Sequence, residues 1–272
     1  MPRKSDTNPD DLILFDSHCH LTDSLYADDL PTVLKRAHQA GVKTLMTVSL
    51  SVPNSRENIA LASTESDLYC AVGIHPHEAD SFRPHDLQSL KNLCIESSVK
   101  AIGETGLDFF RGYSSKANQE TAFRAQIEMA RMLDLPMIIH VREAAPRARQ
   151  ILEEHGYFYG VLHCFSGDRR FADWAVEKGL YISFAGNLTH DVALPEVARG
   201  VPHERLMVET DSPYQVPVPE RGRVKRCEPA FLRHTVSFLA QTLDRPVSEV
   251  AKMTFENGCR CFRISQDNTS PG

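Results

Sequence analysis

The chain has 272 residues, of which 42% are hydrophobic and 24% are charged, and its formal net charge at pH 7 is −6. This length and composition are those of a globular protein with a full core. The negative charge excludes a protein coated in basic surface for indiscriminate nucleic-acid binding. It is still compatible with a local basic groove. No run approaches the roughly 18 apolar residues of a membrane span, so we expect no membrane partner.

Residues 1–11 are polar and lack the apolar core of a signal peptide. After them, apolar runs alternate with amphipathic stretches. The apolar runs predict strands at 12–16, 42–49, 68–75, 99–104, 136–141, 160–165, 179–184 and 205–210. The stretches that follow them predict helices at 27–40, 54–64, 85–95, 116–133, 143–155, 168–178, 190–199 and 229–243, with an extra helical cap at 247–262.

Strands that are nearly all apolar indicate a parallel sheet buried on both faces. A doubly wound sheet is possible, but eight strand–helix units in this length favour a single (β/α)₈ TIM barrel. No linker rich in Pro, Gly or Ser divides the chain. We therefore expect one barrel domain at 12–264, between flexible tails at 1–11 and 265–272.

The seven cysteines contain no C-x-x-C pair and do not resemble a disulfide framework. This usage indicates a reducing compartment, and we expect a cytoplasmic protein.

Two histidines, His18 and His20, directly follow the first apolar run. In an extended segment, side chains two residues apart share a face, so both imidazoles could hold one metal ion. Taken alone, the pair is equally compatible with ordinary loop histidines.

Other strand ends strengthen the metal hypothesis, because a barrel gathers the C-terminal ends of its strands at one mouth. Each of these residues alone could simply satisfy backbone groups, but together they predict a polynuclear metal site. The residues at the other strand ends are His75, His77, Glu104, His140, His163 and Asp211.

Imidazole and carboxylate ligands without cysteine suit zinc, manganese or iron, and suit magnesium less well. A central carboxylate such as Glu104 could bridge two divalent ions, which would polarise a phosphoryl or carbonyl oxygen and activate a water. Cys19 and Cys164 lie beside candidate ligands, and we expect both to point to the opposite strand face and pack in the core.

Six ordered motifs resemble those of the TatD family of metal-dependent hydrolases, over about residues 14–262. The motifs are "FDSHCHL", "GIHPHEA", "AIGETGLDFF", "PMIIHVREA", "LHCFSGD" and "LMVETDSPY". "YISFAG" and the loop after the eighth strand are most similar to the YcfH-like branch. The resemblance implies an amidohydrolase-like barrel with two divalent metal ions per chain.

By the same resemblance, one metal would be held by His18, His20, Glu104 and Asp211, and the other by Glu104, His140 and His163. His75 would contact the scissile phosphate or assist proton transfer, and His77 would orient the loop or contact substrate. Asp211 would also accept the proton of the attacking water. Arg142, next to Glu143, would pair with it or face substrate.

One loop departs from the family pattern R-G-K-x-N-E-P. Here it reads "RGRVKRCEP", with Cys227 at the asparagine position and an apparent extra residue. Its cations Arg221, Arg223, Lys225 and Arg226 are either a solvated surface or contacts to a phosphate backbone.

The leading hypothesis is a metal-dependent deoxyribonuclease that cleaves DNA phosphodiester bonds from a single-stranded end. A second is a hydrolase of carboxylic esters or amides, such as aminoacyl-tRNA esters, because both chemistries need the same water and Lewis acid. A third is a non-catalytic metal-binding quality-control protein. We expect a monomer.

Overall fold

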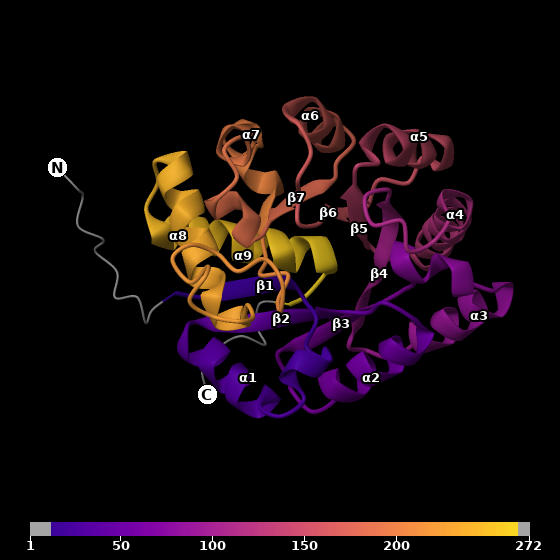
Figure 1. Ribbon diagram of the computed structural model, residues 1–272, viewed down its shortest axis with the longest axis horizontal. Coiled ribbons are helices and arrows are strands. Elements are labelled where there is room, and N and C mark those ends of the chain that lie inside the picture. Colours follow the sequence, from indigo (N-terminus) through magenta and orange to yellow (C-terminus); the bar gives the residue numbers. More distant parts are fainter. Residues whose placement is uncertain (1–11, 266–272) are drawn as a thin grey trace.

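The computed structural model describes residues 12–265, so the predicted tails lie outside the described residues apart from Ser265. Eight parallel strands pair in the order of the chain, which confirms the predicted barrel (Figure 1). The strands are β1 (Leu14–Cys19), β2 (Val42–Val48), β3 (Leu68–Val72), β4 (Val99–Asp108), β5 (Met137–Arg142), β6 (Gly160–Leu162), β7 (Tyr181–Phe184) and β8 (Leu206–Val208).

The barrel closes between β1 and β8 through a bridge and side-chain bonds. Cys19 and Ser212 form an isolated parallel bridge, and the His20 N–H donates to the Ser212 carbonyl over 2.8 Å. Deeper in the seam, the Asp16 carboxyl accepts bonds from the N–H and hydroxyl of Thr210, over 2.8 and 2.5 Å. Burial raises the pKa of Asp16 to about 8, so this seam carries no full negative charge at neutral pH.

Helices surround the barrel (Figure 1). In the described part of the chain, none is long and apolar enough to cross a membrane. The α-helices are α1 (Leu30–Gln39), α2 (Val52–Ala62), α3 (Pro84–Leu93), α4 (Lys116–Leu133), α5 (Ala145–His155), α6 (Arg169–Glu177), α7 (Leu194–Gly200), α8 (Leu232–Leu243) and α9 (Val247–Phe262). Short 3₁₀ helices are η2 (Ser24–Tyr26), η3 (Pro76–Ser81), η4 (Gly186–Thr189), η5 (His203–Arg205) and η6 (Pro229–Phe231).

The predicted cap helix α9 crosses one end of the barrel. Its side chains Phe255 and Phe262 pack on Phe15 inside the barrel, with ring centroids 6.3 and 5.9 Å apart. Asn257 donates to the carbonyls of His203 and Leu206, at the start of β8. Helix α9 therefore covers the N-terminal ends of the strands and leaves their C-terminal ends for a site.

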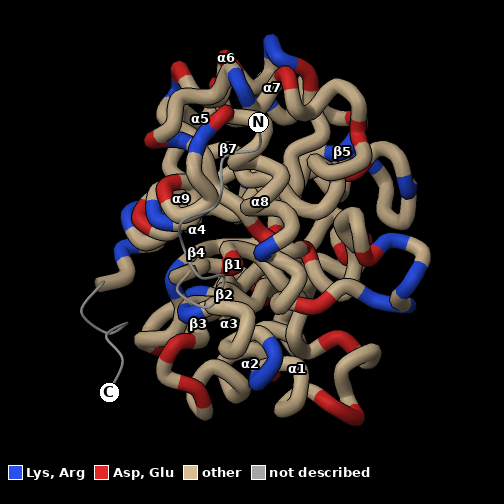
Figure 2. The backbone as a smooth tube through the Cα atoms, turned by 90° about the vertical axis from the view of Figure 1, so that its left-hand side faces the viewer, with Lys and Arg blue, Asp and Glu red and all other residues tan. Residues whose placement is uncertain are grey.

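Some element boundaries differ from the sequence prediction for local reasons. Helix α2 begins at Val52 because the Ser51 hydroxyl accepts the Asn54 N–H and caps it. Helix α7 begins only at Leu194. The Asp191 carboxylate accepts the N–H groups of Ala193 and Leu194, and a 3₁₀ turn occupies 186–189. Figure 2 shows positions of Lys and Arg interspersed with positions of Asp and Glu along the backbone.

Candidate metal centre

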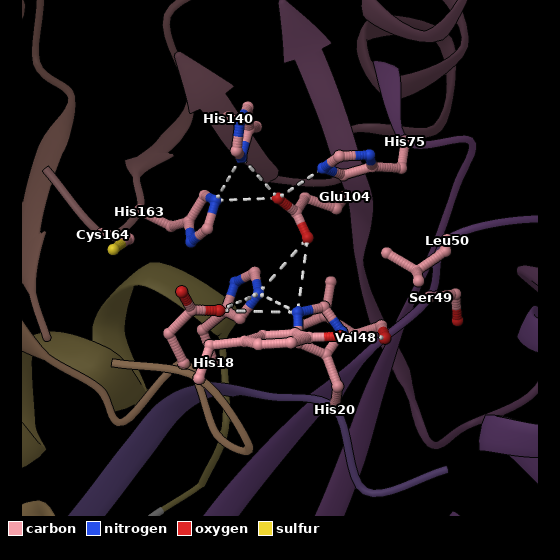
Figure 3. A network of polar contacts seen from close by, with 12 residues as sticks. His18, His20, Val48, Ser49, Leu50, His75, Glu104, His140, His163 and Cys164 are labelled. Atoms are coloured by element: carbon pink, nitrogen blue, oxygen red, sulfur yellow. Dashed lines mark hydrogen bonds and ion pairs between the residues drawn. The ribbon is translucent and has the colours of Figure 1, made fainter. Parts of the chain in front are cut away.

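The predicted ligands meet at the C-terminal end of the barrel, beside a cavity of about 520 Å³. They lie on or just after β1, β3, β4, β5, β6 and β8. Figure 3 shows the side chains of His75, His140 and His163 pointing toward Glu104. All are buried except the half-buried His140. The residues brought together are His18, His20, His75, Glu104, His140, His163 and Asp211.

Two glycines let β4 approach β5 closely enough to join Glu104 and His140. A Cβ added at Gly103 would lie 2.7 Å from the Ile138 Cβ, and one at Gly106 would lie 2.0 Å from the His140 carbonyl oxygen. Gly106 also has a φ of +136°, which side-chain-bearing residues rarely adopt. Strand β4 continues through Gly106 to Asp108.

The same continuation corrects the prediction that the fourth strand ends at Glu104. Residues beyond it pair with β5, from Thr105 opposite Ile139 to Asp108 opposite Arg142. Glu104 therefore lies within a paired strand, where its backbone is held on both sides.

One carboxylate oxygen of Glu104 faces three imidazoles. Its Oε1 lies 2.8 Å from His140 Nδ1, 2.8 Å from His163 Nε2 and 3.2 Å from His75 Nε2. Three ring nitrogens thus converge on one oxygen in a water-poor site.

The other oxygen faces the pair of histidines on β1 and the loop after it. Glu104 Oε2 lies 3.4 Å from His18 Nε2 and 3.6 Å from His20 Nε2. Asp211 Oδ1 lies 3.7 and 3.5 Å from the same two nitrogens, which are themselves 3.1 Å apart. Glu104 therefore stands between two separate groups of nitrogen atoms.

Burial and the imidazoles act in opposite directions on the carboxylates. Burial alone would raise the pKa of Glu104, but His75, His163 and His18 hold that pKa well below its usual range. For Asp211, burial is likewise outweighed by the hydrogen bond from His20, which lowers its pKa. Both carboxylates are ionised at neutral pH, so the cluster attracts positive charge.

In two histidines, the hydrogen bond on the side of the ring that faces away from Glu104 fixes which ring nitrogen carries no hydrogen in the neutral form. His20 Nδ1 lies 3.2 Å from the Val48 carbonyl, and His163 Nδ1 lies 3.2 Å from Glu209 Oε1. Because a carbonyl or carboxylate only accepts, each Nδ1 carries the hydrogen, and each Nε2 of the neutral ring presents its lone pair to the centre.

In neutral His140 the hydrogen is on the other ring nitrogen, and a lone pair again faces the centre. Its Nε2 lies 3.2 Å from the carboxylate of Asp108, so in the neutral ring Nε2 carries the hydrogen and Nδ1 faces Glu104 with a lone pair. The carboxylates of Asp108 and Glu209 therefore orient the histidines nearest Glu104 Oε1.

His18 is held by stacking instead. Its ring lies on that of His163, with centroids 3.9 Å apart and planes 9° apart. Its Nδ1 is buried without a hydrogen-bond partner, and burial lowers its pKa, so the ring is neutral. With His20, His140 and His163 in their neutral forms, four imidazoles and two carboxylates make a donor set that fits divalent cations such as zinc, manganese or iron.

His75 differs from His20, His140 and His163 in the nitrogen that faces the centre, which carries the hydrogen. Its Nδ1 accepts the N–H of His77 over 3.0 Å, so a neutral His75 carries its hydrogen on Nε2 and points that N–H toward Glu104. Burial lowers the pKa of His75 to about 4, which keeps the ring neutral at pH 7. His75 is close enough to hold a metal but presents a donor to the site.

The remaining predicted residues lie farther out. His77 Nε2 is 2.8 Å from Asp108 Oδ2. Arg142 lines the cavity, with its guanidinium 4.0 Å from the Phe110 ring centroid. Of the two expectations for Arg142, pairing with Glu143 or facing substrate, the position at the mouth agrees with the second.

The basic loop divides into two parts. Arg221 and Arg223 are exposed, and Arg221 contributes to lowering the pKa of the cavity residue His190, after the larger effect of burial. Arg226 turns inward and bonds Asp29 and Glu228 over 2.6 and 3.0 Å.

Cys227 is fully buried behind this loop. Its carbonyl accepts the Tyr26 hydroxyl over 2.5 Å, and its N–H donates to Pro213. The departure at the asparagine position therefore lies behind the mouth and outside the cavity lining.

The cysteine prediction is right for one residue and wrong for the other. Cys19 is buried and its thiol donates to the Met46 carbonyl over 3.4 Å. Cys164 lines the cavity, because β6 ends at Leu162 and the Cys164 φ of +41° breaks the alternation of strand faces.

Sequence reasoning missed Asp108 and Glu209. Both are acidic residues at or just after the end of an apolar strand, in "GLD" and "VET", so the rule that selected Asp211 would also have selected them. Both are almost fully buried, at 1% and 0% exposed.

Comparison with known proteins agrees with this geometry. The family model "TatD related DNase" matches residues 15–263. The chain belongs to the TatD family of metal-dependent hydrolases. This confirms the family expected from the six motifs.

Individual TatD relatives match over nearly their whole length. YcfH of Escherichia coli, described as an uncharacterized metal-dependent hydrolase, is 37% identical over 93% of this chain and 97% of its own. The 3'-5' ssDNA/RNA exonuclease TatD of Salmonella typhimurium is 32% identical over 92% of this chain and 99% of its own. The crystal structure of the TatD homolog YjjV from Escherichia coli is 27% identical, with a TM-score of 0.87 over 93% of this chain and 98% of that one.

Proposed function

We propose that this protein holds two divalent cations on either side of Glu104 and hydrolyses phosphodiester bonds near the end of a single-stranded nucleic acid, DNA in particular. The observation that carries the proposal is the position of Glu104, whose two oxygens face two separate groups of ring nitrogens.

The proposed ligand groups combine the two carboxylates and His18 with the three imidazoles whose hydrogen-free nitrogens are described above. In the proposal, His18, His20, Glu104 and Asp211 would hold one cation, and Glu104, His140 and His163 would hold the other. When bound, the cations supply Lewis acidity that polarises a phosphoryl oxygen and lowers the pKa of a water.

His75 and Asp211 take complementary parts in proton handling. The Nε2–H of His75 points into the site and donates a hydrogen bond to a non-bridging oxygen of the phosphate, and the ring stays neutral while doing so. Asp211 is ionised and accepts a proton from the attacking water at its carboxylate. His77, held by Asp108, orients the loop that carries His75.

Two observations support a nucleic-acid strand as substrate. Arg111 and Arg142 line the cavity, and a relative covered over nearly its whole length is named an exonuclease for single-stranded DNA and RNA. A cavity at the end of a barrel admits the end of a single nucleic-acid strand more easily than an intact duplex.

The test is turnover by metal-stripped protein reloaded with zinc, manganese, iron or magnesium one at a time. The substrates are a 5′-labelled single-stranded DNA, the same sequence as RNA, the duplex, and a p-nitrophenyl ester. We expect progressive shortening of the single strand, slower cleavage of the duplex and little ester hydrolysis.

The Glu104→Gln variant, purified by the same procedure, is the control for contaminating nucleases. Ester hydrolysis without strand cleavage would replace the proposal by the carboxylic-ester alternative. Metal binding with no turnover of any substrate would favour the non-catalytic alternative. The monomeric state and the cytoplasmic location stay predictions.

A further inference from the structure

Exposed aromatic side chains gather at the mouth of the cavity. Phe110, Tyr113 and Tyr214 are 50%, 64% and 50% exposed, and among residues 12–265 they are the aromatic residues with large exposed side chains. Tyr113 and Tyr214 line the cavity directly. Aromatic rings of this size are normally buried in a protein core. Three exposed rings gathered beside the candidate metal centre therefore indicate a binding surface.

Phe110 is paired with guanidinium groups. The Arg142 guanidinium lies 4.0 Å from the Phe110 ring centroid, and that of Arg111 lies 5.7 Å from it. Among residues 12–265, both arginines face this ring and neither forms an ion pair with a carboxylate. Their charges therefore remain available to an anionic ligand.

The loop that carries these rings is held rigidly relative to the candidate metal centre. Asp108 Oδ1 accepts the N–H groups of Phe110 and Arg111 over 3.0 and 2.8 Å. Its other oxygen lies 3.2 Å from His140 Nε2. One buried carboxylate thus fixes both the aromatic loop and a proposed ligand, so the distance between them is set by the fold.

A second anchor holds the far end of the loop. The Gln119 side chain donates to the carbonyls of Asp108 and Ser114 over 3.0 and 2.9 Å. The Ser114 hydroxyl donates to the His77 carbonyl over 2.7 Å. The Tyr113 ring, between these anchors, lies 4.8 Å from the His77 ring at 80°.

We propose that Phe110, Arg142 and Tyr113 form a stacking platform for the bases of a single-stranded nucleic acid whose scissile phosphate lies at Glu104. This inference rests on the proposed function and adds to it how the strand is recognised. A flat apolar ring backed by a guanidinium matches the alternation of base and phosphate along a strand. Stacking needs no particular base and requires that bases be unpaired, so the platform predicts sequence-tolerant cleavage of single strands.

The test compares two DNA strands that differ only in their last two 3′ nucleotides, which carry bases in one strand and are abasic in the other. The variants are Phe110→Ala, Phe110→Trp and the control Ile95→Ala, whose side chain is 83% exposed outside the cavity lining. Turnover is measured with the most active metal, and binding is measured by fluorescence anisotropy with phosphorothioate-linked strands.

We expect the natural chain to favour the base-bearing strand by about 5- to 150-fold in kcat/KM, mostly through KM, which is the range of one stacked base. Phe110→Ala should lose most of this preference, because its kcat/KM should decrease much more for the base-bearing strand than for the abasic strand. Phe110→Trp should keep the preference, and Ile95→Ala should match the natural chain.

Cleavage of both strands with an unchanged preference in Phe110→Ala would overturn the platform and leave the proposed function standing. Failure to cleave either strand with any metal would overturn the proposed function. In that case binding decides the platform: weaker binding of the base-bearing strand by Phe110→Ala supports it, and equal binding refutes it.

Discussion

Asp108 holds the outer nitrogen of His140, with Oδ2 3.2 Å from Nε2, and the same oxygen lies 2.8 Å from His77 Nε2. Burial alone would raise the pKa of Asp108, but the hydrogen bonds from His140 and His77 lower it below its ordinary value. The ionised carboxylate therefore selects the His140 tautomer whose lone pair faces Glu104.

Replacing this carboxylate by an amide tests the tautomer argument. In Asp108→Asn, an oxygen can still accept the loop N–H groups, but an NH₂ group would face His140 Nε2 and favour a hydrogen on the wrong nitrogen. We expect a roughly 10- to 100-fold decrease in metal affinity with little change in melting temperature. Metal titration and a melting curve check this, with the exposed Asp173→Asn on α6 as control.

Glu104 is the second test of the centre, because both its oxygens face imidazoles. Glu104→Gln keeps the size of the side chain but removes its charge, and an amide nitrogen cannot serve as a ligand. We expect lower metal occupancy and a decrease in turnover greater than the roughly 10- to 100-fold typical of an outer partner. If Glu104 only caps backbone groups, the variant will have lower thermal stability at normal metal content and activity.

His75 and His163 lie at similar distances from Glu104 Oε1, yet their tautomers predict different phenotypes. His163→Ala should lower the metal content, because it removes a lone pair. His75→Ala should keep the metal content and lower kcat by about 10²- to 10³-fold, the cost of removing one donor to a developing charge. Elemental analysis of both variants decides, and a lower metal content in His75→Ala would make His75 a ligand.

The fold and most of the centre could be predicted from sequence because barrel topology converts strand order into spatial proximity. His18 and Asp211 are far apart in the chain, yet His18 lies near the end of β1 and Asp211 follows β8, and both strands end at the same mouth. The orientation of Cys164 could not be predicted, because a positive φ after β6 overrides the alternation of a strand. The partner of Arg226 could not be predicted either, because Asp29 approaches it only through the packing of α1 beside the loop.

The cations of the loop after β8 should separate into two functions. Arg221 and Arg223 are exposed, so neutralising both should weaken strand binding and reduce its salt dependence, by a slope of roughly 0.7 for each phosphate that is no longer neutralised. Arg226→Ala should instead lower the melting temperature by a few degrees, because it removes the bonds to Asp29 and Glu228 and the packing on the Tyr26 ring. Binding at several salt concentrations and melting curves on the same proteins test both parts, and an unchanged salt slope would make Arg221 and Arg223 ordinary surface residues.

The closed end of the barrel depends on a glycine in α9. A Cβ at Gly258 would lie 2.5 Å from a ring atom of Phe15, so Gly258→Ala sets about 1 kcal/mol of gained helix propensity against an overpacking cost of about 1–3 kcal/mol. We expect the clash to win by about 1 kcal/mol, because Phe15 is also fixed by Phe255 and Phe262. Denaturant unfolding of metal-stripped protein measures this, with the exposed Lys252→Ala on the same helix as control.

Replacing the ring in Phe15→Leu should relieve the clash, so the double variant should be more stable than the sum of the single effects. Strict additivity, or a more stable Gly258→Ala, would show that α9 can shift away from the barrel.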